Sequence, residues 1–208
     1  MLVNHLGAPI LIAAAFLGCG IPEKEEPLNV GDGGGHSDHQ KGSIDAGVPT
    51  SGETLVEATS TADWVYWDFS TGSVSTVTDP AASLDWDLGI RRTQLATNSG
   101  TSGKGSAGAV STGSKDWASI TQCPADGYQV DAMLPIPGPP GSGEYSGNPA
   151  LSEWFNYDPA THAVSSQGLV YCLRTADGKH AKLSIVNYAS GQMTIRWRYQ
   201  PDGSLAVQ

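Results

Sequence analysis

One stretch of the chain has residues whose types and spacing could do chemistry. Asp85 and Asp87 lie two residues apart, and the glycine-rich run after them contains the pattern G-x-G-x-x-G at Gly103, Gly105 and Gly108. Alternate residues of a strand share a face, so the two carboxylates could serve as the acid pair of a glycosidase. Glycines with this spacing, between a strand and a helix, hold the pyrophosphate of a dinucleotide.

The residues around the glycines argue against a phosphate site. The segment after Gly108 reads AVSTGSKDW and predicts no helix whose N-terminus could hold a phosphate. A Walker A loop is excluded as well, because Asn98 stands where its first glycine belongs and Gly105 follows Lys104 where Ser or Thr is required. We therefore expect a mobile surface loop that joins strands.

The two carboxylates also have a simpler interpretation. Solvated or arginine-paired acids are common on strands, and Arg91 and Arg92 follow within a few residues. The sequence contains no G-x-S-x-G and no H-E-x-x-H motif, and it shows no cysteine with a triad pattern. These observations favour a binding protein over an enzyme.

The elements that would position these residues are strands. Apolar and polar residues alternate in WVYWDFSTGSVSTVT, which predicts a hairpin over 64–77, and SLDWDLGIRRTQLAT is a second extended run. Near the C-terminus, ADGK and ASGQ divide GLVYCLRTADGKHAKLSIVNYASGQMTIRWRYQPDG into three strands of a meander. Residues 61–208 therefore predict a single antiparallel all-β domain, with at most a short helix near 116–122.

The first 18 residues predict a secretory signal peptide. The run LGAPILIAAAFLG is apolar but shorter than the ~20 residues of a membrane-spanning helix. It ends in FLGC, which resembles the lipobox of bacterial lipoproteins, so that cleavage before Cys19 would leave an N-terminal cysteine to carry acyl chains. The alternative is an ordinary signal peptide in which Cys19 has no such role. Gly20 after the cysteine resembles the pattern of lipoproteins sent to the outer membrane.

Residues 19–60 are expected to form a disordered, acidic, glycine-rich tether. They contain few long apolar side chains, so they cannot bury enough surface to offset the entropy of ordering. They also carry most of the chain's net charge of −10. The remaining charge is small and the Lys and Arg residues are scattered, which argues against a nucleic-acid partner. His36 and His39 could bind a metal loosely, or they could simply be solvated.

Two further cysteines, Cys123 and Cys172, lie in the all-β segment. An exported protein matures where thiols oxidise, so we expect these two to form one disulfide. The alternative is a pair of buried free thiols.

Several blocks of this sequence, in the order quoted, resemble the HmuY-like family of bacterial lipoproteins. The blocks are WVYWDFSTGSV, DWDLGIRR, TNSGTSGKGSAG, WFNYDPATHAV, YCLRTADGKHAKLSIVNY and RWRYQPDGS, and the resemblance covers roughly 62–204. It implies an all-β fold, an association with the outer membrane and, as in characterised members, the binding of haem for uptake. It also implies that TNSGTSG is a structural or rim loop.

The resemblance also implies a pair of axial ligands to the haem iron, His or Met, between the glycine-rich loop and the final meander. In that region this chain offers Met133 and His162. Each has an alternative role, Met133 as a core side chain and His162 in the turn after Asp158 and Pro159. His180 is expected to face solvent, together with Lys182 and Ser184 on the same face of its strand. Tyr128, Trp154, Phe155 and Tyr157 are candidates for the walls of the site, and Arg91, Arg92 and Lys104 are candidates for the haem propionates.

We therefore expect a lipid-anchored outer-membrane protein that faces the periplasm or the cell surface and binds haem or a related tetrapyrrole for uptake. Its partners could include an outer-membrane transporter. The alternative is a surface structural or interaction lipoprotein that keeps the fold without binding haem. A carbohydrate-binding module that uses the tryptophans is a third interpretation.

Overall fold

The computed structural model describes residues 50–136 and 141–208. The predicted lipidation site Cys19 and the two tether histidines, His36 and His39, lie outside the described residues. Within the described part, no helix is long and apolar enough to cross a membrane.

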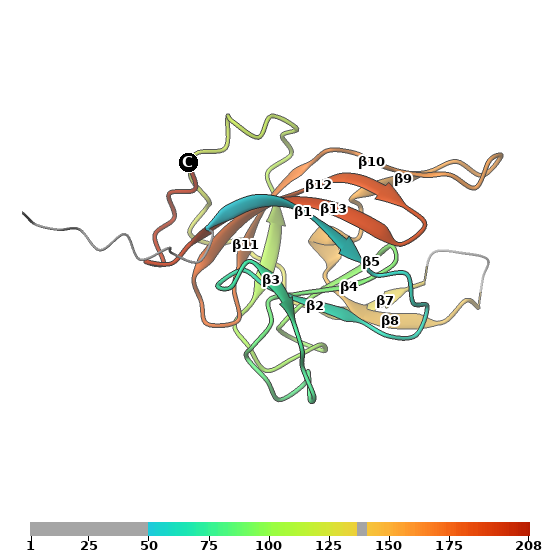
Figure 1. Ribbon diagram of the computed structural model, residues 1–208, viewed down its shortest axis with the longest axis horizontal. Coiled ribbons are helices and arrows are strands. Elements are labelled where there is room, and N and C mark those ends of the chain that lie inside the picture. The colour runs from blue at the N-terminus through green and yellow to red at the C-terminus, as the bar shows by residue number, and fades with distance from the viewer. Residues whose placement is uncertain (1–49, 137–140) are drawn as a thin grey trace, which may run out of the picture. The chain divides into compact units, whose positions relative to one another are not determined.

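The larger sheet of the domain is antiparallel and has five strands. In sheet order these are β1 (Ser51–Glu57), β13 (Gln192–Gln200), β12 (His180–Ala189), β11 (Val170–Arg174) and β6 (Gly108–Ser111). The meander predicted for the C-terminal third is confirmed, since β11, β12 and β13 are consecutive neighbours joined by the two predicted turns (Figure 1).

Strand β1 corrects one predicted boundary. The sequence assigned residues 51–57 to the tether, yet all seven pair with β13, and Val56 is buried. The pairing is made by backbone groups of a strand more than a hundred residues away, so the local composition gave no sign of it. The folded domain therefore begins before residue 61.

The second sheet has four strands and packs on the first. Its order is β3 (Ser73–Ser75), β2 (Val65–Asp68), β4 (Leu88–Arg91) and β5 (Gln94–Thr97). The predicted hairpin over 64–77 is confirmed. The run 83–97, predicted as one extended segment, instead contains two antiparallel strands, β4 and β5, joined by a turn at Arg92 and Thr93. The core lies between the two sheets, where the rings of Trp67 and Trp197 meet edge to face at 5.5 Å.

Two short hairpins complete the domain. One consists of β7 (Ala132–Pro135) and β8 (Glu144–Gly147), and the other of β9 (Phe155–Tyr157) and β10 (Val164–Ser166). The 3₁₀ helix η1 (Pro149–Leu151) lies between them and is the one helix among the described residues, whereas the segment 116–122 forms turns. The prediction of an all-β antiparallel fold is confirmed.

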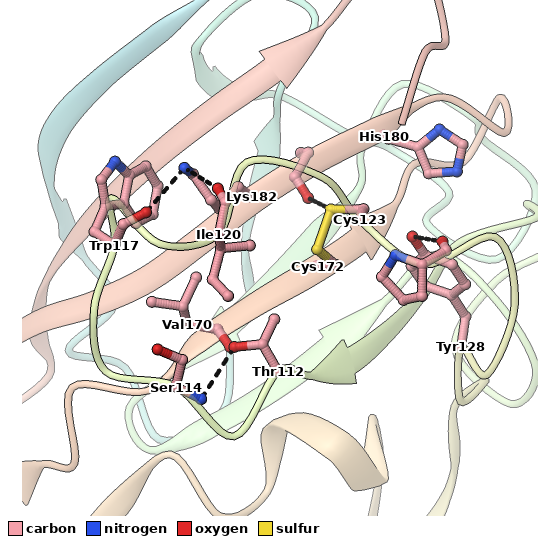
Figure 2. The surroundings of a disulfide bond; sticks show 12 residues. Thr112, Ser114, Trp117, Ile120, Cys123, Tyr128, Val170, Cys172, His180 and Lys182 are labelled. Atoms are coloured by element: carbon pink, nitrogen blue, oxygen red, sulfur yellow. Dashed lines mark hydrogen bonds between the residues drawn. A yellow bond between two sulfur atoms is a disulfide. The ribbon is translucent and has the colours of Figure 1, made fainter. Parts of the chain in front are cut away.

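The predicted disulfide between Cys123 and Cys172 is present (Figure 2). It ties the segment after β6 to the outer face of β11 and spans 49 residues, which corresponds to about 4 kcal/mol in the chain-entropy model. The same segment covers Lys182, whose ammonium group donates to the carbonyl oxygens of Trp117 and Ile120. Lys182 is only 2% exposed. This part of the sheet's outer face is therefore shielded from solvent, contrary to the expectation from the sequence.

The glycine-rich loop is tightly packed and not a mobile surface loop. A Cβ atom on Gly105 would lie 2.6 Å from the backbone oxygen of Asn98, and one on Gly103 would lie 2.1 Å from the Asn98 side chain. Asn98 is fully buried, donates to the carbonyl oxygens of Ser83 and Trp86, and accepts from the Gly105 amide. The glycines therefore allow a close approach of backbone to a buried asparagine, and the chain continues into strand β6.

The two carboxylates Asp85 and Asp87 do not form a catalytic pair. Asp85 is exposed and bonds to Ser83, whereas Asp87 is buried and accepts from the amides of Phe69 and Ala176. Burial raises the pKa of Asp87 to about 7, although the two amide donors oppose that shift. Asp87 thus links distant segments of the fold.

Candidate functional site

The two short hairpins extend from the same end of the domain (Figure 1). Buried contacts fix the base of each one. At β8, Asn148 donates to Asp131 and Thr97, and the Asp131 carboxylate also accepts from Thr97. At β9, the buried ring of Trp154 donates from Nε1 to the carbonyl oxygen of Thr93. These bonds hold the hairpins in place relative to the turn between β4 and β5.

Three hollows share lining residues and run from the space between the two hairpins to the turns beside His162, and we call them together the interhairpin groove. Their volumes are about 360, 250 and 460 Å³. Ile136 joins the first hollow to the second, Arg92 joins the second to the third, and Thr93 lines all three. Each hollow lies at or near the lower end of the size range of small-molecule sites, and together they can accommodate a larger ligand.

The first part of the groove is mainly apolar. Its walls are Leu134, Pro135 and Ile136 from the β7–β8 hairpin and Phe155 from β9, with Tyr145 at its boundary. This arrangement offers a flat ligand two facing hydrophobic surfaces from separate hairpins.

The other end of the groove contains His162, which lies in the turn between β9 and β10. Its Nδ1 makes a short hydrogen bond with the hydroxyl group of Tyr157 on the same hairpin. No described residue bonds to Nε2. A histidine with one ring nitrogen fixed by a hydrogen bond and the other free has the arrangement that metal-binding histidines use.

The backbone around this end is unusual. Arg92, His162 and Ser190 are the non-glycine residues with positive φ among the described residues, at 53°, 58° and 52°. All three line the same hollow. Such conformations are uncommon for non-glycine residues, and here each lies in a hairpin turn: Arg92 after β4, His162 between β9 and β10, and Ser190 after β12. Three turns therefore meet at this hollow.

Two arginines supply positive charge to the groove. Arg92 lines the second and third hollows, and Arg91 lines the second. Neither has a carboxylate partner among the described residues, so both can meet anionic groups of a ligand. Lys104, the third cation suggested by the sequence, is exposed in the glycine-rich loop and lines none of the three hollows.

Met133 and His162 line different hollows. Adjacent residues of a strand face opposite sides, so Met133 points away from the groove that Leu134 lines. Its side chain is 51% exposed and borders a separate hollow with Tyr66 and Trp86. The second axial ligand suggested by the sequence therefore does not lie beside the first.

The other residues suggested by the sequence divide between the groove and the rest of the fold. Phe155 and Tyr157 line the groove, whereas Trp154 is a core residue. Tyr128 packs beside His180, and His180 is half-buried with Nδ1 in contact with the carbonyl oxygen of Gly203. His180 is therefore less solvated than expected and is not part of the groove.

Several groove residues were not predicted from the sequence. Leu134 and Ile136 alternate before the proline-rich run, which is a hairpin signal that could have identified them. Thr93 and Ser190 carry no chemical signal in the sequence, because their importance comes from the turns in which they lie.

Comparisons with known proteins agree on one family. A family model described as HmuY protein matches residues 60–199. No curated protein matches this chain.

Three solved structures share the fold. They are the apo HmuY analog of Tannerella forsythia, a candidate HmuY-like haem-binding protein of Bacteroides vulgatus, and a candidate lipoprotein of Bacteroides fragilis. The first is 19% identical, with a TM-score of 0.57 over 73% of this chain and 96% of its own. The second is 24% identical, with a TM-score of 0.56 over 72% and 92%. The third is 21% identical, with a TM-score of 0.56 over 73% and 93%.

Proposed function

The chain belongs to the HmuY family, and on that premise we propose that it binds haem or a related tetrapyrrole in the interhairpin groove. The observation that carries the proposal is the groove itself, which combines facing apolar walls, unpaired arginines and a histidine with a free ring nitrogen. A tetrapyrrole is a flat apolar ring with anionic propionates and a central metal, so each part of the groove has a matching part of the ligand.

In this proposal His162 binds the iron through Nε2 while Tyr157 fixes the ring through Nδ1. The side chains of Ile136 and Phe155 pack on the two faces of the macrocycle. Arg92 meets a propionate, since its guanidinium group has no carboxylate partner among the described residues. The chain's role is that of a binding protein, and the tetrapyrrole is its cargo.

Met133 lies on the face of β7 away from the groove, so a role as second ligand would require the β7–β8 hairpin to twist when the tetrapyrrole binds. Thioether sulfur prefers the softer, reduced iron. Replacement of Met133 by alanine should therefore weaken binding of ferrous haem and leave ferric binding unchanged. An affinity for ferrous haem unchanged from the wild type would remove Met133 from the site.

We further propose that Cys19 is lipidated and anchors the protein at the outer membrane, where it would deliver its cargo to a transporter. The lipobox-like FLGC supports this, and one protein of the same fold, from Bacteroides fragilis, is described as a candidate lipoprotein.

The experiment that tests the proposal is a ferric haem titration followed at the Soret band. The wild-type protein should give a saturable one-to-one spectrum, and His162→Ala should bind at least tenfold more weakly, in line with the loss of a metal ligand. His180→Ala is the matched control and should bind as the wild type does. A wild-type protein without a saturable spectral change would favour the alternative, an interaction lipoprotein that keeps the fold without haem.

A further inference from the structure

A second hollow, of about 380 Å³, lies on the side of β7 toward which Met133 points. We call it the aromatic hollow. Its lining includes the rings of Trp64, Tyr66 and Tyr145 and the hydroxyl groups of Thr101, Ser102 and Ser146. Glu144, whose side chain is exposed, also lines it and can accept hydrogen bonds from ligand hydroxyls. Ring faces and hydroxyl groups are thus presented to the same small volume.

Two tyrosine hydroxyls at this hollow have no partner among the described residues. Tyr145 is only 5% exposed, and the ring of the half-buried Tyr66 is tilted against that of Trp86 at 4.8 Å. Neither hydroxyl is among the fully buried, unpartnered side-chain atoms of the described residues, so both are accessible to a ligand or to water. Burial raises the pKa of both tyrosines, which therefore remain hydrogen-bond donors at neutral pH.

Arg91 adds a positive charge to the rim. Its Nε donates to Gln94, one Nη donates to the carbonyl oxygen of Ala62, and the guanidinium group lies 4.6 Å from the centre of the Trp64 ring. These contacts fix the group in position and leave other N–H donors unused. Since Arg91 has no carboxylate partner among the described residues, it is available to an anion.

The hydroxyl rim is preorganised by the glycine-rich loop. The Ser146 hydroxyl bonds to those of Thr101 and Ser102, and the Thr101 amide donates to the carbonyl oxygen of Asp131. The buried Asn98 holds the loop from the other side. Thr101 and Ser102 of the glycine-rich loop are therefore held in place at the hollow.

We propose that the aromatic hollow binds a sugar ring that carries a carboxylate, such as a hexuronic acid. The C–H faces of the ring would pack on Tyr66 and Tyr145, the sugar hydroxyls would bond to the polar rim, and the carboxylate would pair with Arg91. The volume is at the low end for small-molecule sites, which suits a single ring. The proposal does not require tetrapyrrole binding, although Arg91 and Tyr145 line both the aromatic hollow and the interhairpin groove.

The test is a ¹H–¹⁵N NMR titration of the full protein with glucuronate and, separately, with glucose. Glucuronate should shift the Trp64 indole signal and the amides of Thr101, Ser102 and Ser146, with affinity in the millimolar range. Arg91→Gln should weaken glucuronate binding about tenfold or more, as expected for the loss of a charged hydrogen bond, and leave glucose unaffected. Ser146→Ala should weaken both sugars.

The groove variant His162→Ala is the control, and it should bind glucuronate as the wild type does. The proposal fails if neither sugar shifts these signals, or if the shifts fall on the interhairpin groove. Equal affinity for glucose and glucuronate in the wild type would overturn the assignment of an acidic ligand.

Discussion

His162 depends on a neighbour to present one ring nitrogen. Its imidazole is exposed at a hairpin turn, and the bond from Nδ1 to the Tyr157 hydroxyl is the hydrogen bond that orients it. Partners of this kind fix the tautomer and the direction of a metal-binding histidine.

We therefore predict that Tyr157→Phe weakens ferric haem binding by about tenfold to a hundredfold, because the ring of residue 157 stays while the orienting hydroxyl is lost. Titration at the Soret band measures this. Tyr188→Phe is the control, since Tyr188 lines the same hollow and its hydroxyl bonds to no described residue. An unchanged affinity in Tyr157→Phe would mean that the imidazole needs no orienting partner.

The buried Asp87 predicts a pH dependence of stability. Its pKa is raised to about 7 in the folded protein from an ordinary value of 3.8, so the folded chain holds this proton to higher pH than the unfolded chain does. The free energy of unfolding should therefore fall as the pH rises from about 4 to about 7, by at most about 4 kcal/mol from this group.

Asp87→Asn isolates that contribution, because asparagine does not titrate. Chemical denaturation at several pH values should show that the wild type loses stability relative to the variant between pH ~4 and ~7. Above pH ~7 the difference in stability should stay constant. A constant difference across that range would show that Asp87 stays ionised in the folded protein.

Residues with a distinctive chemistry could be predicted from the sequence. The pairing of Cys123 with Cys172 is confirmed, and His162 lies in the groove as a prediction still to be tested. Met133 was chosen for its sulfur alone, and which face of β7 it occupies depends on the strand register. Thr93 could not be predicted, because it acts through its backbone position.

At the scale of elements, the glycine-rich loop shows how one pattern can arise from different causes. The spacing of Gly103, Gly105 and Gly108 matches a nucleotide motif, but the structure uses these residues for close backbone packing on Asn98 and Gln129. In the sequence, the absence of a predicted helix after Gly108 was what distinguished a packed loop from a nucleotide-binding loop.

Gly105→Ala should destabilise the protein by about 1–3 kcal/mol, because the new methyl group would meet the backbone oxygen of Asn98 at 2.6 Å. Thermal unfolding measures the loss. Gly52→Ala is the control, since its Cβ would make ordinary contact with Trp197 at 3.4 Å on an edge strand. Equal unfolding temperatures for the two variants would contradict the packed loop.

The hairpin over 64–77 and the C-terminal meander were predicted correctly, because turn residues and alternation are local signals. Strand β1 was missed since only its partner β13, far along the chain, makes it a strand. The outer face of β12 at Lys182 was misjudged for a related reason. The covering segment that contains Trp117 is irregular, and no periodicity predicts where such a segment lies.

At the scale of the whole molecule, the sequence predicts a signal peptide that ends before a lipobox-like cysteine, Cys19. Cys19→Ser should move the protein from the detergent phase to the aqueous phase in Triton X-114 partitioning, since more than one acyl chain is needed for stable anchoring. Mass spectrometry of the mature N-terminus is the accompanying measurement. A wild-type protein that is already aqueous and begins at another residue would contradict lipidation.

The central claim is that a tetrapyrrole lies between the two hairpins, and an NMR map of its position tests this most directly. Zinc protoporphyrin, which is diamagnetic, can be titrated into the ¹⁵N-labelled protein. The account predicts the largest shifts at Thr93, Leu134, Phe155 and His162, with the amides of Thr101 and Ser102 unchanged. Shifts centred on Thr101 and Ser102, or none at the hairpins, would contradict it.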